Sequence, residues 1–203
     1  MDSEQWTVNS EQWTVNSNQC AVKTVLDSNT ITDEMLVAEL YRLGVKHLAR
    51  LEIVEPPNIT PTELIKGLAT SEDARVRGSL ILLFLRYSSF HQYTLEASKQ
   101  LPPKATQTLK LFYQAAFYLQ IELEATLREL LGGWRPLPDL FSKELNLPSA
   151  GTSADQLLRL LGEKHRELTG KACNWSGSYR QNIPRFIKHL QRDYGHHNIW
   201  TIA

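Results

Sequence analysis

Cysteine is scarce in this sequence, and its cysteines are poorly placed for structural use. Cys20 and Cys173 are the only two among 203 residues, and they lack the spacing of a metal site. Disulfide frameworks require several paired cysteines and an oxidising compartment. The composition therefore argues against a disulfide scaffold and predicts reduced thiols in a cytoplasmic protein.

Long apolar runs are also missing. The strongest run, LILLFL at residues 80–85, is far shorter than the roughly 20 residues that a bilayer crossing requires. The first residues lack the basic start and apolar stretch of a signal peptide. The 22 basic and 22 acidic side chains balance, so no overall field attracts nucleic acid or an anionic membrane. We therefore predict no membrane contact.

Familiar catalytic and metal-binding motifs do not occur. The sequence has no Walker loop, no GxGxxG, no GxSxG, no CxxC pair and no zinc-finger spacing. Four possible metal ligands lie near the C-terminus: His189, Asp193, His196 and His197. Imidazole and carboxylate groups at this spacing can bind a transition metal. Adjacent histidines near a terminus are usually solvated, so we predict no metal site and no cofactor.

From residue 30 onward, apolar side chains recur at helical spacing. The pattern predicts helices over residues 30–51, 60–68, 71–87, 90–101, 105–131 and 154–168, and within 178–194. Thr60 and Glu63 have the spacing of a capping box. The stretch between Lys110 and Glu122 is uncharged, so its helix should lie at the centre. We predict an all-α fold, a single bundle of about six to seven helices.

The first 29 residues differ from the rest of the chain. They are polar and contain one heptapeptide, SEQWTVN, written twice at residues 3–9 and 10–16. We predict a disordered tail over 1–29 that precedes a helical domain over 30–203. Two alternatives stay open: Trp6 and Trp13 could dock on a partner, and residues 20–26 could form one strand.

In the segment RYSSFH, four residues separate Arg86 from His91. A cation can stabilise a phosphorane, and a near-neutral imidazole can move a proton. The spacing resembles the R-x4-6-H motif of HEPN-domain ribonucleases, and this resemblance implies metal-independent attack by a ribose 2′-hydroxyl. The sequence departs from that pattern at Tyr87, where a polar residue is usual. The structural alternative is that Arg86 ends one helix and His91 begins the next.

Charge is distributed unevenly along the chain. Residues 1–63 carry ten acids and four bases, a net charge of −6, whereas residues 154–197 carry eight bases and four acids, a net charge of +4. Arg185, Lys188 and Arg192 fall within about 60° on a helical wheel. Apolar residues occupy the opposite side. We predict an outward basic stripe that contacts nucleic-acid phosphates or an acidic protein; a merely solvated face is the alternative.

Three phrases, LKLFYQAAFYLQ, LPDLFSKELNLP and TGKACNWSGSY, resemble segments of a family of uncharacterised all-helical bacterial proteins. The resemblance spans residues 35–192 and implies a helical fold without an assigned activity. The many apolar helix faces, the oppositely charged halves of the chain and the lack of a convincing catalytic cluster favour a non-catalytic cytoplasmic interaction protein. We expect a partner or regulatory subunit in a small bacterial system, which binds another protein or forms a homodimer. The alternatives are a HEPN-like ribonuclease that uses Arg86 and His91, and a nucleic-acid-binding helical protein.

Overall fold

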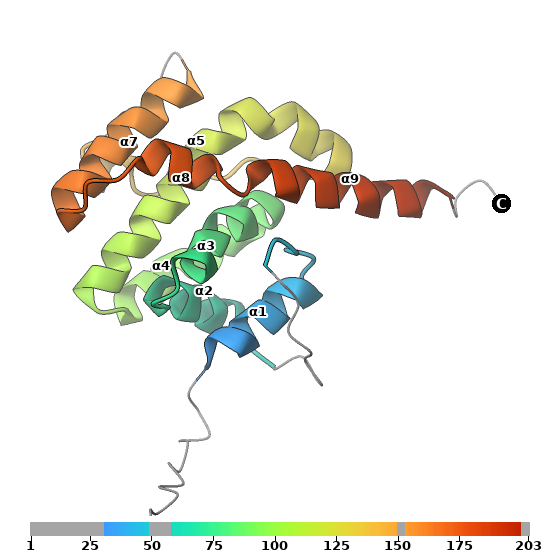
Figure 1. Ribbon diagram of the computed structural model, residues 1–203, viewed down its shortest axis with the longest axis horizontal. Coiled ribbons are helices and arrows are strands. Elements are labelled where there is room, and N and C mark those ends of the chain that lie inside the picture. The colour runs from blue at the N-terminus through green and yellow to red at the C-terminus, as the bar shows by residue number, and fades with distance from the viewer. Residues whose placement is uncertain (1–30, 49–57, 150–152, 200–203) are drawn as a thin grey trace, which may run out of the picture. The chain divides into compact units, whose positions relative to one another are not determined.

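The computed structural model describes residues 31–48, 58–149 and 153–199, and this part of the chain is helical without strands. The α-helices are α1 (Asp33–Arg42), α2 (Pro61–Thr70), α3 (Ala74–Arg86), α4 (His91–Gln100), α5 (Pro103–Leu131), α6 (Ser142–Leu145), α7 (Ala154–Thr169), α8 (Trp175–Arg180) and α9 (Ile183–Ile199), with a 3-10 turn, η1 (Ser88–Phe90), before α4 (Figure 1).

The all-α prediction is confirmed for these residues. Seven of the helices correspond to those expected from apolar spacing. The single turn of α6 lies in the proline-rich connection, where the sequence also allows one turn of helix, and the short helix α8 is additional. The duplicated heptapeptide, the predicted tail over 1–29 and the alternative strand over 20–26 lie outside the described residues. Among the described residues, no helix combines the length and apolar character that crossing a bilayer would require.

Helix α5 lies at the centre of the bundle, as its uncharged stretch predicts. It packs against α2, α3, α4, α7 and α9. Ala115 and Ala116 are fully buried, and their small side chains let neighbouring helices approach closely. Tyr113 is buried too, and its ring meets the edge of Phe84 at 4.9 Å between centroids. The core therefore forms around the middle of one long helix.

Several helix ends follow from local side-chain chemistry. The capping box of α2 is present, because Thr60 Oγ1 accepts from the Glu63 amide while the Glu63 carboxylate accepts from the Thr60 amide. Ser153 caps α7, and Gly170 ends it with φ of +67°. The sequence predicts that α3 begins at Ser71, but in the structure Asp73 is the residue that caps its N-terminus.

The first predicted helix is wrong at its C-terminal end. Instead of reaching residue 51, α1 ends at Arg42, and the Val45 amide donates back to the Leu40 carbonyl. Gly44 makes this turn with φ of +74°, a conformation that glycine adopts without strain. A Cβ at this position would lie 2.7 Å from Nη2 of Arg86. The turn thus also leaves room for a side chain from α3.

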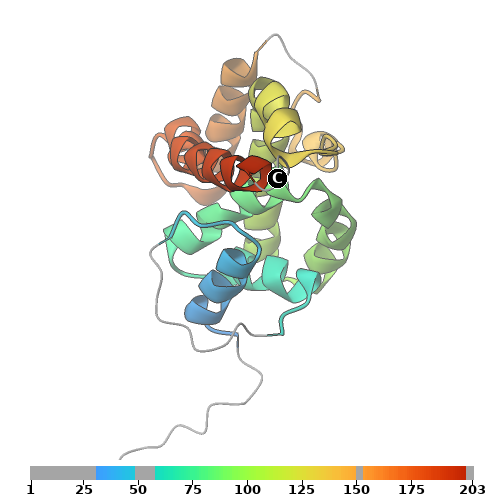
Figure 2. The same cartoon turned by 90° about the vertical axis from the view of Figure 1, so that its right-hand side faces the viewer.

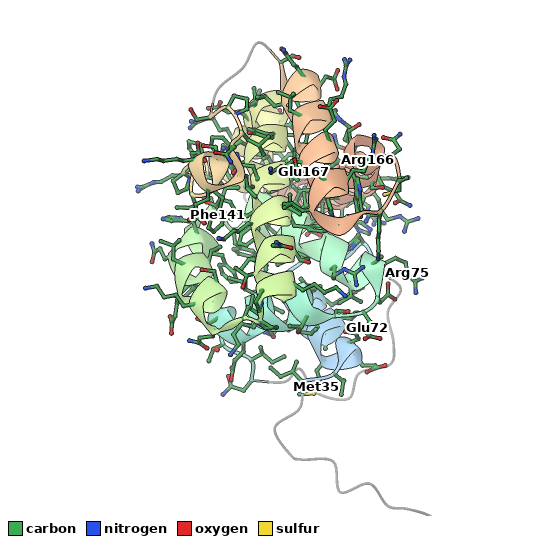
Figure 3. The ribbon with its side chains drawn as sticks, turned by 90° about the vertical axis from the view of Figure 1, so that its left-hand side faces the viewer. Met35, Glu72, Arg75, Phe141, Arg166 and Glu167 are labelled. Carbon is green, nitrogen blue, oxygen red and sulfur yellow. The ribbon has the colours of Figure 1, made fainter. Side chains whose placement is uncertain are left out.

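The proline-rich connection over residues 132–148 is held by side chains of α5. Gln120 accepts from the Leu137 amide at 2.6 Å and donates to the Leu137 carbonyl at 3.1 Å. Tyr113 donates to the Pro138 carbonyl at 2.8 Å. Phe141 is buried beside α5 (Figure 3), with its ring 5.3 Å from that of Tyr113. These contacts order a segment that is mostly without regular structure.

Candidate functional site

Helix α9 has one buried side and one exposed basic side. Ile183, Phe186 and Leu190 are buried in the core, and the helix packs against α5 (Figure 1, Figure 2). The exposed residues Arg185, Lys188 and Arg192 are called the basic face below. Because a helix rises about 1.5 Å per residue, these three residues span about 10 Å along its axis.

None of the three cations of the basic face meets a carboxylate within the described part of the chain. Arg185 donates from Nη1 to the His47 carbonyl at 3.1 Å, which fixes its side chain over the turn after α1. Arg192 contacts the ring of His189. Lys188 makes no hydrogen bond or ion pair with another described residue. Among the described residues, no carboxylate therefore pairs with these three positive charges.

Asp193 is the only acidic residue of α9, and cations from two other elements engage it. Its carboxylate lies 3.7 Å from Nζ of Lys46 and 3.8 Å from Nη2 of Arg86. With the basic face, five cations stand against one carboxylate, a net charge of +4. Both ion pairs are long and partly exposed, so their contribution to stability is small. They place cations from outside α9 beside the Asp193 carboxylate.

Arg86 is largely an interior residue. It ends α3, and its side chain is 17% exposed. The guanidinium packs against Gly44 and lies 5.7 Å from the ring centroid of Tyr87. Its Nη1 is buried without a hydrogen-bond partner. Arg86 therefore joins the end of α3, the turn at Gly44 and α9, and it offers little surface to a substrate.

His91 has a separate partner. It begins α4, and its Nδ1 donates to the Ser88 carbonyl at 2.7 Å, which closes the η1 turn. No hydrogen bond or ion pair joins Arg86 to His91. Each residue occupies the place that the structural alternative assigns to it, at the end of α3 or the start of α4. The ribonuclease role suggested by their spacing stays a prediction.

Two histidines border the basic face. In the sequence, His189 stands out only as a candidate metal ligand, and His47 does not stand out. His47 is buried, with Nε2 lying 3.2 Å from Oγ of Ser79. Burial lowers the pKa of His47 to about 4, and nearby Arg185 acts in the same direction. Burial, followed by the charge of Arg192, also lowers the pKa of His189. Near neutral pH the charge of this surface therefore comes from lysine and arginine.

A second buried histidine belongs to an aromatic cluster between α7 and α8. The ring of His165 stacks on Trp175 with 3.4 Å between centroids, and its Nδ1 lies 2.7 Å from the Tyr179 hydroxyl. Burial lowers the pKa of His165 to about 4 and raises that of Tyr179. A neutral imidazole enclosed by rings packs α8 onto α7, and we assign it no catalytic role.

The described residues contain no group of three or more histidine, cysteine or acidic side chains placed to hold a metal ion. His189 and Asp193 lie on one face of α9, while the side chains of His196 and His197 lie outside the described residues. The helix continues through Gly195 to Ile199. A turn at Gly195, which the sequence would allow and which could bring these residues together, is therefore not present.

Comparisons with known proteins assign no family or function to this chain. The chain matches no protein-family model, no curated protein and no solved structure. The resemblance to an uncharacterised bacterial family, and the local resemblance to HEPN ribonucleases, both stay predictions. The function must therefore be argued from the site.

Proposed function

We propose that this protein is a non-catalytic interaction protein whose partner binds the basic face of α9. One observation carries the proposal: Arg185, Lys188 and Arg192 are exposed and lack a carboxylate partner among the described residues, while the opposite side of their helix is buried. The buried side fixes the helix backbone, so the three side chains leave it from positions in a constant arrangement. Such preorganisation lowers the entropic cost of binding.

The neighbouring polar groups support binding rather than catalysis. Arg86 is mostly buried against Gly44 and pairs with Asp193. His47 is buried and neutral near physiological pH. A general base must reach the proton that it removes, and neither a buried imidazole nor a buried guanidinium presents its polar atoms to a bound substrate here.

The partner should be anionic. Two sources fit the role of a cytoplasmic partner or regulatory subunit in a small bacterial system: an acidic protein, which includes a second copy of this chain, and a nucleic acid. Residues 1–63 have a net charge of −6, so a second copy carries charge of the required sign. Electrostatic complementarity of this kind speeds association and selects partners.

The test is capture of a partner by tagged full-length protein in its native cytoplasm. We expect wild type to retain a stoichiometric partner that the variant R185Q/K188Q/R192Q loses. The control R135Q/R159Q/K104Q removes the same number of arginines and lysines from exposed positions elsewhere. Light scattering behind gel filtration at about 50 and 500 mM salt detects self-association, which salt weakens when charge drives it. A lone monomer under every condition would overturn the proposal.

A further inference from the structure

We infer that the basic face binds the phosphodiester backbone of nucleic acid, without reading its sequence. This inference rests on the proposed function, because it names the partner of the same surface. The exposed large apolar side chains of the described residues are Tyr93, Leu95, Ile121, Leu160 and Tyr194. Of these only Tyr194 belongs to α9.

Tyr194 does not share the basic face. At 100° per residue it lies about 180° from Arg185 around the helix axis, on the side that carries Leu190. The basic face is therefore polar throughout. Protein–protein interfaces have an apolar core that is depleted of charged residues, whereas protein–DNA interfaces are more polar and much more positively charged. The composition of this face thus favours nucleic acid over an acidic protein.

The arrangement of charge points the same way. Arg185, Lys188 and Arg192 form a line along one helix face, and the only acid of that helix is already paired with Lys46 and Arg86. A row of cations without an interspersed anion matches a regular chain of like charges, such as a nucleic-acid strand. Two of the three cations are arginines, whose forked donors fit phosphate oxygens.

The number of contacts sets the strength and the salt dependence of binding. Three phosphate contacts give a slope of log K against log salt of about −2.7 on duplex DNA and about −2 on a single strand. Between about 50 and 200 mM salt, affinity should then fall roughly 40-fold for duplex and roughly 20-fold for a single strand. The three residues of the basic face include no aromatic side chain that could stack on bases, so we expect little sequence preference.

The experiment measures fluorescence anisotropy of the full-length protein with a labelled 20-base-pair DNA duplex, a single-stranded RNA of the same length, and polyglutamate. We expect both nucleic acids to bind with these slopes, R185Q/K188Q/R192Q to lose binding at least tenfold, and R135Q/R159Q/K104Q to bind as wild type. Lys188→Gln disturbs no contact among the described residues and should make the salt slope shallower by about 1. It keeps the inference testable if the triple variant folds poorly.

The contrary outcomes are distinct. Equal nucleic-acid binding by wild type and Lys188→Gln, with unchanged salt slopes, overturns the inference because the contact then lies elsewhere. Binding of polyglutamate without binding of either nucleic acid also overturns it but leaves the proposed interaction protein intact. If no polyanion binds, the inference fails, and the capture experiment alone decides the proposed function.

Discussion

Replacing Gln120 by leucine should destabilise the protein strongly, although the new side chain is apolar and the site is buried. The amide of Gln120 pairs with both backbone groups of Leu137, at 2.6 and 3.1 Å. Leu137 is 3% exposed, so solvent has little access to the groups that the substitution would strand. Each buried backbone group left without a partner costs about 1–3 kcal/mol. We therefore expect the free energy of unfolding to fall by about 2–5 kcal/mol.

The assay is urea unfolding followed by circular dichroism, with midpoint and slope fitted together. Gln92→Leu is the matched control, because Gln92 is exposed on α4 and should change stability by less than about 0.5 kcal/mol. For a chain of this size, the loss at Gln120 corresponds to a melting temperature lower by about 5–15 °C. If Gln120→Leu is no more harmful than Gln92→Leu, the connection over 132–148 is not held as described.

Three further measurements test other parts of the structure. Gly67→Ala should destabilise the fold by about 1–3 kcal/mol, because its Cβ would lie 2.6 Å from a buried leucine of α1. A Cβ at Gly78 would meet only Nδ2 of Asn182, at 4.0 Å, so Gly78→Ala should stabilise the fold by about 0.5–1 kcal/mol in a urea titration. His47 and His165 have pKa values of about 4 when folded and 6.5 when unfolded, so the unfolded chain binds more protons between these values. The free energy of unfolding that these two residues contribute is therefore fully present above pH 6.5 and falls towards pH 4, by up to about 3 kcal/mol for each residue. Urea midpoints that stay constant from pH 7 to pH 4.5 would contradict this. Purified protein should not cleave RNA in a gel assay without metal, and cleavage that disappears in His91→Ala would instead establish the ribonuclease alternative.

Local chemistry explains why much of the fold is predictable from sequence. Apolar spacing identifies the long helices, the uncharged stretch of α5 identifies the centre, and Thr60 with Glu63 marks the start of α2. The end of α1 was missed because leucine spacing continues past Gly44, while the turn there accommodates a guanidinium from α3. The residues around Gly44 in the sequence give no indication that Arg86 packs against it.

In the candidate site too, some features follow from local sequence and others depend on residues far away in the chain. The outward direction of the basic face follows from the wheel, because the apolar residues that oppose it belong to the same helix. Its surroundings do not follow, since Lys46 and Arg86 reach Asp193 from positions far earlier in the chain. His47 gave no sequence signal, because its burial depends on Ser79 of α3 and on the backbone contact from Arg185.

The engagement of Asp193 by Lys46 and Arg86 makes the electrostatic character of α9 a property of the assembled fold. A synthetic peptide of residues 183–199 would carry the same bases, but its carboxylate would be free to turn towards Arg192 or Lys188. In the folded chain, Lys46 and Arg86 engage this carboxylate, so it competes less with an external anion for the bases of α9. Substitution of Lys46 or Arg86 can therefore change the electrostatic potential at the surface of α9, although neither residue belongs to that helix.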